Sequence, residues 1–299
     1  MTRITHTTGT RTMLADIMQA NRGMVRAQER LSSQKELSRA SDGPSRALSA
    51  LDHRAVLRRS AQFQRNATDA RGWMVAGDTA LTSGVELMTH VRSLIVSARS
   101  GATDPNALKA IAAEVAGARE AMLSLANSQH QGRPIFSGTA NTTNAFDVSG
   151  AYLGDQGVVM RPVAPSVTLQ VNRSGDEVFG TVDAADPMNG NVFQVLDSIV
   201  AAIDAGDDDQ MALGLERLDV AMDRIESAQV ALGARARQVE DVMARNEISD
   251  IDRRTALSEA EDVDMAQALI DMRAKEFSYQ AALGASAKVL QTSLLDFLR

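Results

Sequence analysis

Apolar residues recur at helical spacing near both ends of the chain. Between Leu14 and Leu31 these positions alternate at intervals of three and four residues, and they include two polar members, Asn21 and Gln28. Near the C-terminus the same spacing occurs at Val263, Ala266, Ile270, Ala274, Phe277, Ala281 and Gly284. Such heptad-like patterns predict two amphipathic helices, and we expect these two helices to pair as a coiled coil.

The prolines mark where further helices begin and end. They stand at Pro44, Pro105, Pro134, Pro162, Pro165 and Pro187. Because a proline costs about 3 kcal/mol inside a helix, the long stretches without proline permit long helices. We expect one helix from Pro44 to a break at Ser100–Gly101, and another from Pro105 to about Gly132.

Helical spacing returns after residue 190. It begins at Phe193, and an acidic turn at Asp204–Asp209 precedes a helix that we expect to reach about Asn246. The acidic turn lacks the residue spacing of a calcium-binding loop. We therefore interpret it as a solvated turn that caps the helix after it.

Residues 133–190 differ in character from the rest of the chain. They contain four of the six prolines, and apolar and polar residues alternate over Val167–Asn172. Strict alternation predicts a half-buried strand, because successive side chains of a strand point to opposite faces. Arg133–Ser137 and Val158–Arg161 are further strand candidates, so this segment is predicted to be a small β insertion.

The predicted fold class is mainly α with a β insertion. We expect a long antiparallel helical stalk, made of a terminal coiled coil plus a helical bundle, that bears a small β-rich domain. The terminal coiled-coil or assembly segments are residues 1–43 and 257–299. Residues 44–132 and 191–256 form the helical stalk domain, and residues 133–190 form the β-rich outer domain.

The composition and the motifs exclude several kinds of functional site. The 299 residues include no cysteine, which excludes disulfide scaffolds, cysteine-ligated metals and thiol catalysis. Neither a phosphate-binding glycine loop nor an HExxH or GxSxG motif is present, and the four histidines are scattered. We therefore expect a protein that is not an enzyme and has no catalytic residue, no cofactor and no metal site.

Charge is distributed unevenly along the chain. Residues 1–71 hold 13 Arg and Lys against 6 Asp and Glu, whereas the other 228 residues hold 18 against 32. The basic residues alternate with apolar ones at helical spacing, which favours a basic helix facing an acidic one. A nucleic-acid or membrane-surface protein that uses residues 1–71 is an alternative class. The interspersed acids and the absence of any aromatic residue before Phe63 disfavour it.

The N-terminal residues are polar and lack the apolar core of a secretory signal, so we expect no cleaved signal peptide. No apolar run approaches the ~20 residues that a membrane-spanning helix needs.

Three regions of the sequence resemble those of the flagellin-like family. Leu31–Leu37 (LSSQKEL) and Arg39–Pro44 (RASDGP) resemble its N-terminal signature, RLSSG followed by SDDP. Gln34 stands where that signature has a glycine, and Gly43 stands where it has the second aspartate. Ala281–Leu298 is similar to the tail of the hook-associated branch of the family, and Gly132–Gly138 (GRPIFSG) is similar to its GxYLFSG element.

This resemblance implies a structural component of the bacterial flagellum. It implies an adapter at the hook–filament junction, and the alternative is a minor flagellin that polymerises into the filament itself. The implied partners are hook-associated protein 1 on the hook side, flagellin on the filament side, further copies of the chain in a ring, and a flagellar export chaperone. Neither nucleic acid nor a membrane is among them. The implied location is extracellular, in the flagellum, after type III export.

The candidate functional residues are the apolar positions of the two terminal helices. An apolar stripe at a chain end is typical of a packing surface, because burying a Leu or Phe contributes about 1.5–3 kcal/mol. The predicted assembly interface comprises Leu14, Ile17, Met24, Leu31, Ile270, Phe277, Leu294, Leu295 and Leu298.

Overall fold

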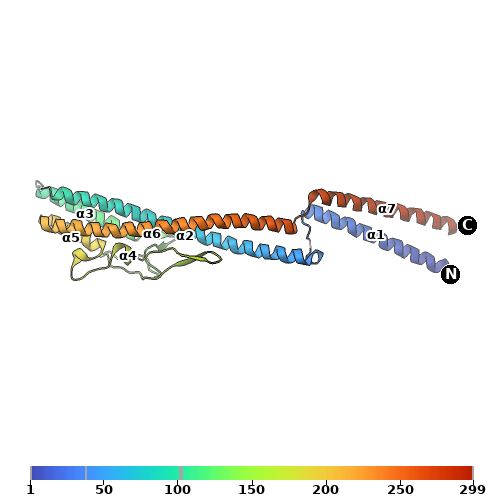
Figure 1. Cartoon of the computed structure of the whole chain (residues 1–299), viewed down its shortest axis with the longest axis horizontal. Helices are drawn as coiled ribbons and strands as arrows, with labels where there is room; N and C mark the ends of the chain where they lie inside the picture. The colour runs from blue at the N-terminus through green and yellow to red at the C-terminus, as the bar shows by residue number, and fades with distance from the viewer. Residues whose placement is uncertain (1, 38, 101–103, 298–299) are drawn as a thin grey trace. The chain divides into compact units, whose positions relative to one another are not determined.

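The computed structural model describes residues 2–37, 39–100 and 104–297, and for residues 2–10, 42 and 289–297 it describes the backbone alone. The chain divides into two compact units (Figure 1). We call residues 1–59 with 249–299 the terminal unit, and residues 60–248 the central unit.

Helices account for most of the described chain, so the predicted class, mainly α with a β insertion, is confirmed. The helices are α1 (Thr2–Ser33), α2 (Pro44–Ala98), α3 (Pro105–Ala126), α4 (Gly175–Phe179), α5 (Val192–Ala205), α6 (Asp208–Glu261) and α7 (Met265–Phe297). Two 3₁₀ turns are η1 (Ala40–Asp42) and η2 (Pro187–Asn189). The strands are β1 (Gln129–His130), β2 (Arg133–Pro134), β3 (Met160–Ala164) and β4 (Val167–Gln170).

Proline and glycine mark the helix ends largely as expected. Pro44 and Pro105 each occupy the first position of a helix, where the missing N–H would have no partner in any case. Gly206, in the left-handed conformation at φ 64°, closes α5 within the acidic turn.

Two helix ends differ from the prediction. The helix that begins at Pro105 ends at Ala126 rather than near Gly132, because the following residues form the hairpin β1–β2. Its two-residue turn has positive φ at both Gln131 and Gly132, which suits the twist of a tight hairpin. The helix expected to end near Asn246 continues to Glu261, since that stretch contains neither proline nor glycine.

The central unit has a large apolar core. Within the central unit α2 and α6 run antiparallel. Two contacts show this direction: Arg99 Nε lies 2.8 Å from Asp208 Oδ1, and Gln229 donates to Thr82 Oγ1 at 2.8 Å. Arg119 Nε lies 3.0 Å from Asp197 Oδ1, which links α3 to α5.

The β insertion contributes to the same core as these helices. β3 and β4 pair antiparallel, with Leu169 buried and Thr168 exposed as the alternation predicts. Phe146 of the insertion packs against Phe193 of α5 with ring centroids 5.2 Å apart, and against Phe179 at 5.5 Å. Removal of the insertion would therefore expose apolar surface on the helices.

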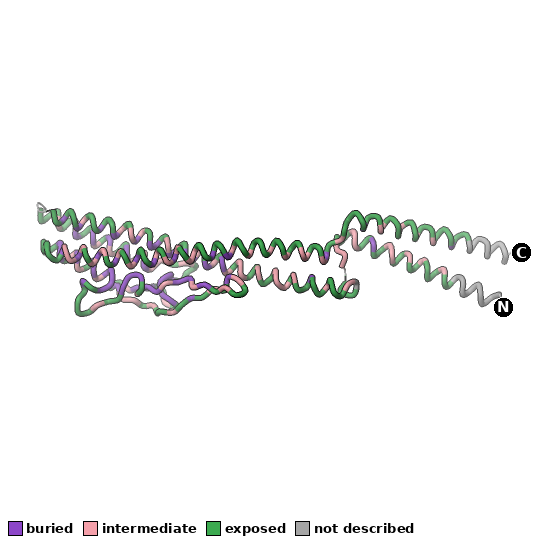
Figure 2. Tube along the Cα trace, viewed as in Figure 1, coloured by how far each residue is buried: buried purple, intermediate pink, exposed green. Residues whose placement is uncertain are grey.

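The terminal unit has a very small core by comparison. Where its side chains are described, the buried apolar residues are Ala27, Ala50 and Ala268 only. Figure 2 shows the same contrast, with buried residues concentrated in the central unit. Because alanine has little apolar surface to bury, the terminal unit gains little stability from its own packing.

Candidate assembly surface

The terminal helices α1 and α7 lie side by side and run antiparallel (Figure 1). Their facing sides follow heptad spacing. On α1 the half-buried or buried positions include Met13, Ile17, Ala20, Met24, Ala27 and Leu31. On α7 they include Ala268, Met272, Tyr279, Ala282 and Ser286. A Cβ added to Gly23 of α1 would lie 3.6 Å from Lys275 Cδ of α7, so the aliphatic part of this side chain packs against α1 there.

The outward side of α1 is a second apolar stripe at heptad spacing. It consists of Leu14, Met18, Asn21, Val25 and Gln28, which are all exposed. Of the predicted interface residues on α1, Leu14 is therefore on the outward stripe, whereas Ile17, Met24 and Leu31 face α7. The predicted seam combined positions from two neighbouring stripes, because both repeat every three or four residues.

The outward side of α7 is also apolar. Ile270 is 62% exposed and Phe277 is 72% exposed, and small exposed residues (Ala266, Ala274, Ala281 and Gly284) continue the stripe. This stripe lies outside the intramolecular seam, because α7 turns a different face, at Ala268 and Ser286, toward α1. Ile270 and Phe277 remain without a covering element among the described residues.

The remaining predicted interface residues are Leu294, Leu295 and Leu298. Leu298 lies outside the described residues, as do the side chains of Leu294 and Leu295.

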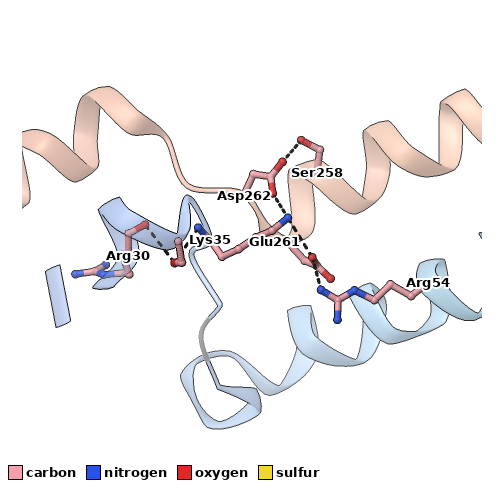
Figure 3. A network of polar contacts seen from close by, with 7 residues as sticks. Arg30, Lys35, Arg54, Ser258, Glu261 and Asp262 are labelled. Atoms are coloured by element: carbon pink, nitrogen blue, oxygen red, sulfur yellow. Dashed lines mark hydrogen bonds and ion pairs between the residues drawn. The ribbon is translucent and has the colours of Figure 1, made fainter. Parts of the chain in front are cut away.

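A network of charged groups joins the segment after α1 to the end of α6 (Figure 3). Lys35 and Asp262 pair as an isolated antiparallel bridge, in which Glu36 N–H donates to the Glu261 carbonyl at 2.7 Å and Val263 N–H donates to the Gln34 carbonyl at 3.1 Å. These backbone bonds set the register between residues 34–36 and residues 261–263. We call these two paired segments the ion-paired joint.

The side chains of the joint centre on Glu261, the only carboxylate that is buried among the described residues. Its Oε2 accepts from Arg54 Nη2 at 2.7 Å and lies 3.3 Å from Lys35 Nζ. A buried carboxylate is costly to desolvate unless charged donors compensate it, and here two cations do so.

Lys35 also donates to Asp262, which accepts a second bond from Ser258 Oγ at 2.5 Å. The hydrogen bond from Lys35, with that from Ser258, lowers the pKa of Asp262 below its usual 3.8. The same contact with Asp262 raises the pKa of Lys35 above 10.5. Both groups are thus charged over the whole neutral range.

Sequence reasoning missed this joint. Lys35, Glu36, Glu261 and Asp262 are ordinary surface residue types, and their partners are more than 200 positions away in the chain. The sequence does signal a turn directly after α1, because the family motif has a glycine at the position of Gln34.

The described residues hold neither a cluster suited to a metal ion nor a helix suited to a membrane. They contain no group of three or more His, Asp or Glu side chains arranged to hold a metal ion. None of the described helices combines the length and the apolar character needed to cross a bilayer.

The paired terminal helices, and a helical central unit that carries a β insertion, match a known class of protein. Residues 4–141 match the family described as Bacterial flagellin N-terminal helical region. This match agrees with the flagellin-like motifs found at the two ends of the chain.

Two relatives and a solved structure make the similarity more specific. Flagellar hook-associated protein 3 of Escherichia coli K12 is 22% identical over 276 residues, which cover 85% of this chain and 87% of the relative. Flagellin of Bacillus subtilis 168 is 23% identical over 313 residues, which cover 99% and 100%. The crystal structure of FlgL from Xanthomonas campestris superposes with a TM-score of 0.61 at 19% identity, over 69% of this chain and 99% of that one. The resemblance to the hook-associated branch is thereby confirmed, and the comparisons support a structural component of the bacterial flagellum.

Proposed function

We propose that this chain is a structural adapter of the bacterial flagellum that joins a hook-associated protein on the hook side to the flagellin filament. The observation that carries the proposal is the second, uncovered apolar stripe on each terminal helix. Exposed faces of Ile270, Phe277, Leu14 and Met18 are costly in water and suit burial against other subunits.

The proposed partners follow from the same surfaces. Helices with two apolar stripes pack in assemblies where each helix has neighbours on two sides, which supports self-association into a ring. Hook-associated protein 1 and flagellin are the proposed neighbours beyond the ring, with an export chaperone before assembly. The three-part division into terminal segments, helical stalk and outer β-rich domain remains a prediction, as does the extracellular location.

A minor flagellin that polymerises into the filament is the alternative. It is favoured by the match to Bacillus subtilis flagellin, which extends over 99% of this chain.

Loss of the gene separates the two functions. For an adapter, a deletion strain should build hooks, release flagellin into the medium and lack filaments, and a plasmid copy should restore filaments. Filaments of normal length in the deletion strain would support the minor flagellin and contradict the adapter.

The proposed surface is tested by Phe277→Asp in the same strain. A charge in the middle of the outward stripe of α7 should leave the protein folded and exported, yet filaments should be lost because the charge would be buried without a partner. Ser278→Asp is the matched control, since Ser278 is exposed on the flank of the stripe and should support filaments. Equal filament formation by both variants would contradict the assembly role of Phe277.

A further inference from the structure

The terminal unit contains a basic cleft that the proposed apolar contacts do not use. Its volume is about 410 Å³, and it lies where α1, the start of α2 and α7 meet. Five cationic side chains line it: Arg26, Arg30, Arg39, Arg46 and Lys275. Only two carboxylates, Glu29 and Glu36, line the cleft with them, so it carries an excess of positive charge.

Most of this excess is not compensated within the chain. Arg30 Nη1 lies 3.6 Å from Glu36 Oε1, which neutralises one pair. Arg26, Arg46 and Lys275 make no ion pair with any other residue that the structure describes. Like charges held around a cleft repel one another, so an acidic partner would relieve this repulsion.

The central unit presents a matching acidic surface on α6. Glu216, Asp223 and Glu226 are spaced by seven and three residues, which places them on one face of the helix. All three are exposed, and within the described part of the chain none of them takes part in an ion pair. We call this set the acidic face of α6.

We propose that the basic cleft of one copy receives the acidic face of α6 from a second copy. The proposal rests on the proposed self-association, and it names the contact that gives neighbouring copies their direction. A cleft on one copy and a different face on the next form a heterologous interface, which generates rings or helices.

The chain's lack of cysteine allows a direct test of intermolecular contact. Ser45→Cys, beside Arg46, and Ser227→Cys, beside Glu226, are introduced into separate preparations, one of which carries a size tag. Both serines are exposed. After mixing and oxidation, mixed dimers should exceed like–like dimers, and 1 M salt should reduce them because the screening length falls to about 3 Å.

Charge exchange then tests the cause of the contact. Adding R26E and R46E to the Ser45→Cys chain should slow mixed cross-linking about tenfold, and adding D223R and E226R to the partner should restore it. R58E with R59E is the matched control: it changes the net charge equally, at exposed positions on α2, and should have no effect. Each rate is divided by that variant's rate with a small disulfide, which corrects for altered thiol reactivity.

The proposal is overturned if mixed dimers do not exceed like–like dimers, if R26E/R46E acts no more strongly than its control, or if the exchanged charges fail to restore cross-linking. The proposed function is judged separately, by filament formation in the deletion strain. Filaments from the R26E/R46E protein, together with absent cross-links, would overturn this contact and leave the adapter function standing.

Discussion

Gln34 shows how one residue joins the sequence motif to the geometry of the terminal unit. It follows the last residue of α1 and has φ 58°, in the left-handed region. A glycine usually takes this position after a helix, because a Cβ there costs roughly 1–2 kcal/mol. The flagellin-like signature has glycine at this point, so the substitution by glutamine is accommodated at an energetic cost beside the ion-paired joint.

Gln34→Gly should therefore stabilise the joint. Glycine removes the Cβ clash but is more flexible when unfolded, so the net gain should be about 0.5–1 kcal/mol. Hydrogen exchange of the Val263 amide, which donates to the residue 34 carbonyl, reports this gain as slower exchange. Gln34→Ala is the control, since it removes the side chain and keeps the Cβ. If the glycine variant exchanged as fast as the alanine variant, the strain at Gln34 would be negligible.

The stability of the joint should also depend on pH, in a direction set by Lys35 and Asp262. The folded-state pKa of Asp262 is lowered, so its stabilisation is present above pH 3.8 and is lost as the pH falls through the folded value. The folded-state pKa of Lys35 is raised, so its stabilisation is present below pH 10.5 and is lost as the pH rises through the folded value.

The protection factor of the Val263 amide, corrected for intrinsic exchange, should be constant across the neutral range and fall below pH 3.8. Asp262→Asn should reduce this loss of protection at acid pH, because the carboxyl group that titrates has been removed. If the protection factor fell by the same amount in the Asn variant, the pH dependence would belong to other carboxylates.

At the scale of the elements, the helices could be predicted from the sequence more fully than their contacts. Pro44 and Pro105 fixed two helix starts, and the alternation over Val167–Asn172 located β4. Periodicity could not decide which of two adjacent stripes on α7 faces α1, because Phe277 and Ala268 both belong to heptad repeats. The pairing of Lys35 with Asp262 could not be predicted either, since it depends on how the chain closes over more than 200 residues.

The contact between the β insertion and the helices makes a further prediction. Phe146 is fully buried and packs on Phe179 and Phe193, so Phe146→Ala should destabilise the central unit by about 3–5 kcal/mol. Val148, two residues away, is 85% exposed, and Val148→Ala should change stability by less than about 0.5 kcal/mol. Urea unfolding followed by circular dichroism measures both. A small effect of Phe146→Ala on the helical transition would mean that the insertion is energetically separate from the helices.

At the scale of the whole molecule, the two units are stabilised to different degrees. The central unit buries many large side chains, including Phe136, Leu81 and Ile199, and can be stable in a single copy. Among its described side chains the terminal unit buries only three apolar residues, all alanines, and it depends on the ion-paired joint and on the partly covered seam between α1 and α7. This contrast is expected of a chain that completes its terminal core only when it assembles.

The central claim, that the outward stripe of α7 is covered by other subunits, is tested most directly by thiol accessibility. The reactivity of Phe277→Cys toward a maleimide is compared between the purified monomer and flagella isolated from a complemented deletion strain, with Val148→Cys as the control on the insertion. We predict that the thiol at position 277 reacts readily in the monomer and is protected at least about tenfold in the assembled structure, whereas the thiol at position 148 reacts equally in both. Equal reactivity at position 277 in the monomer and in the flagellum would contradict the claim.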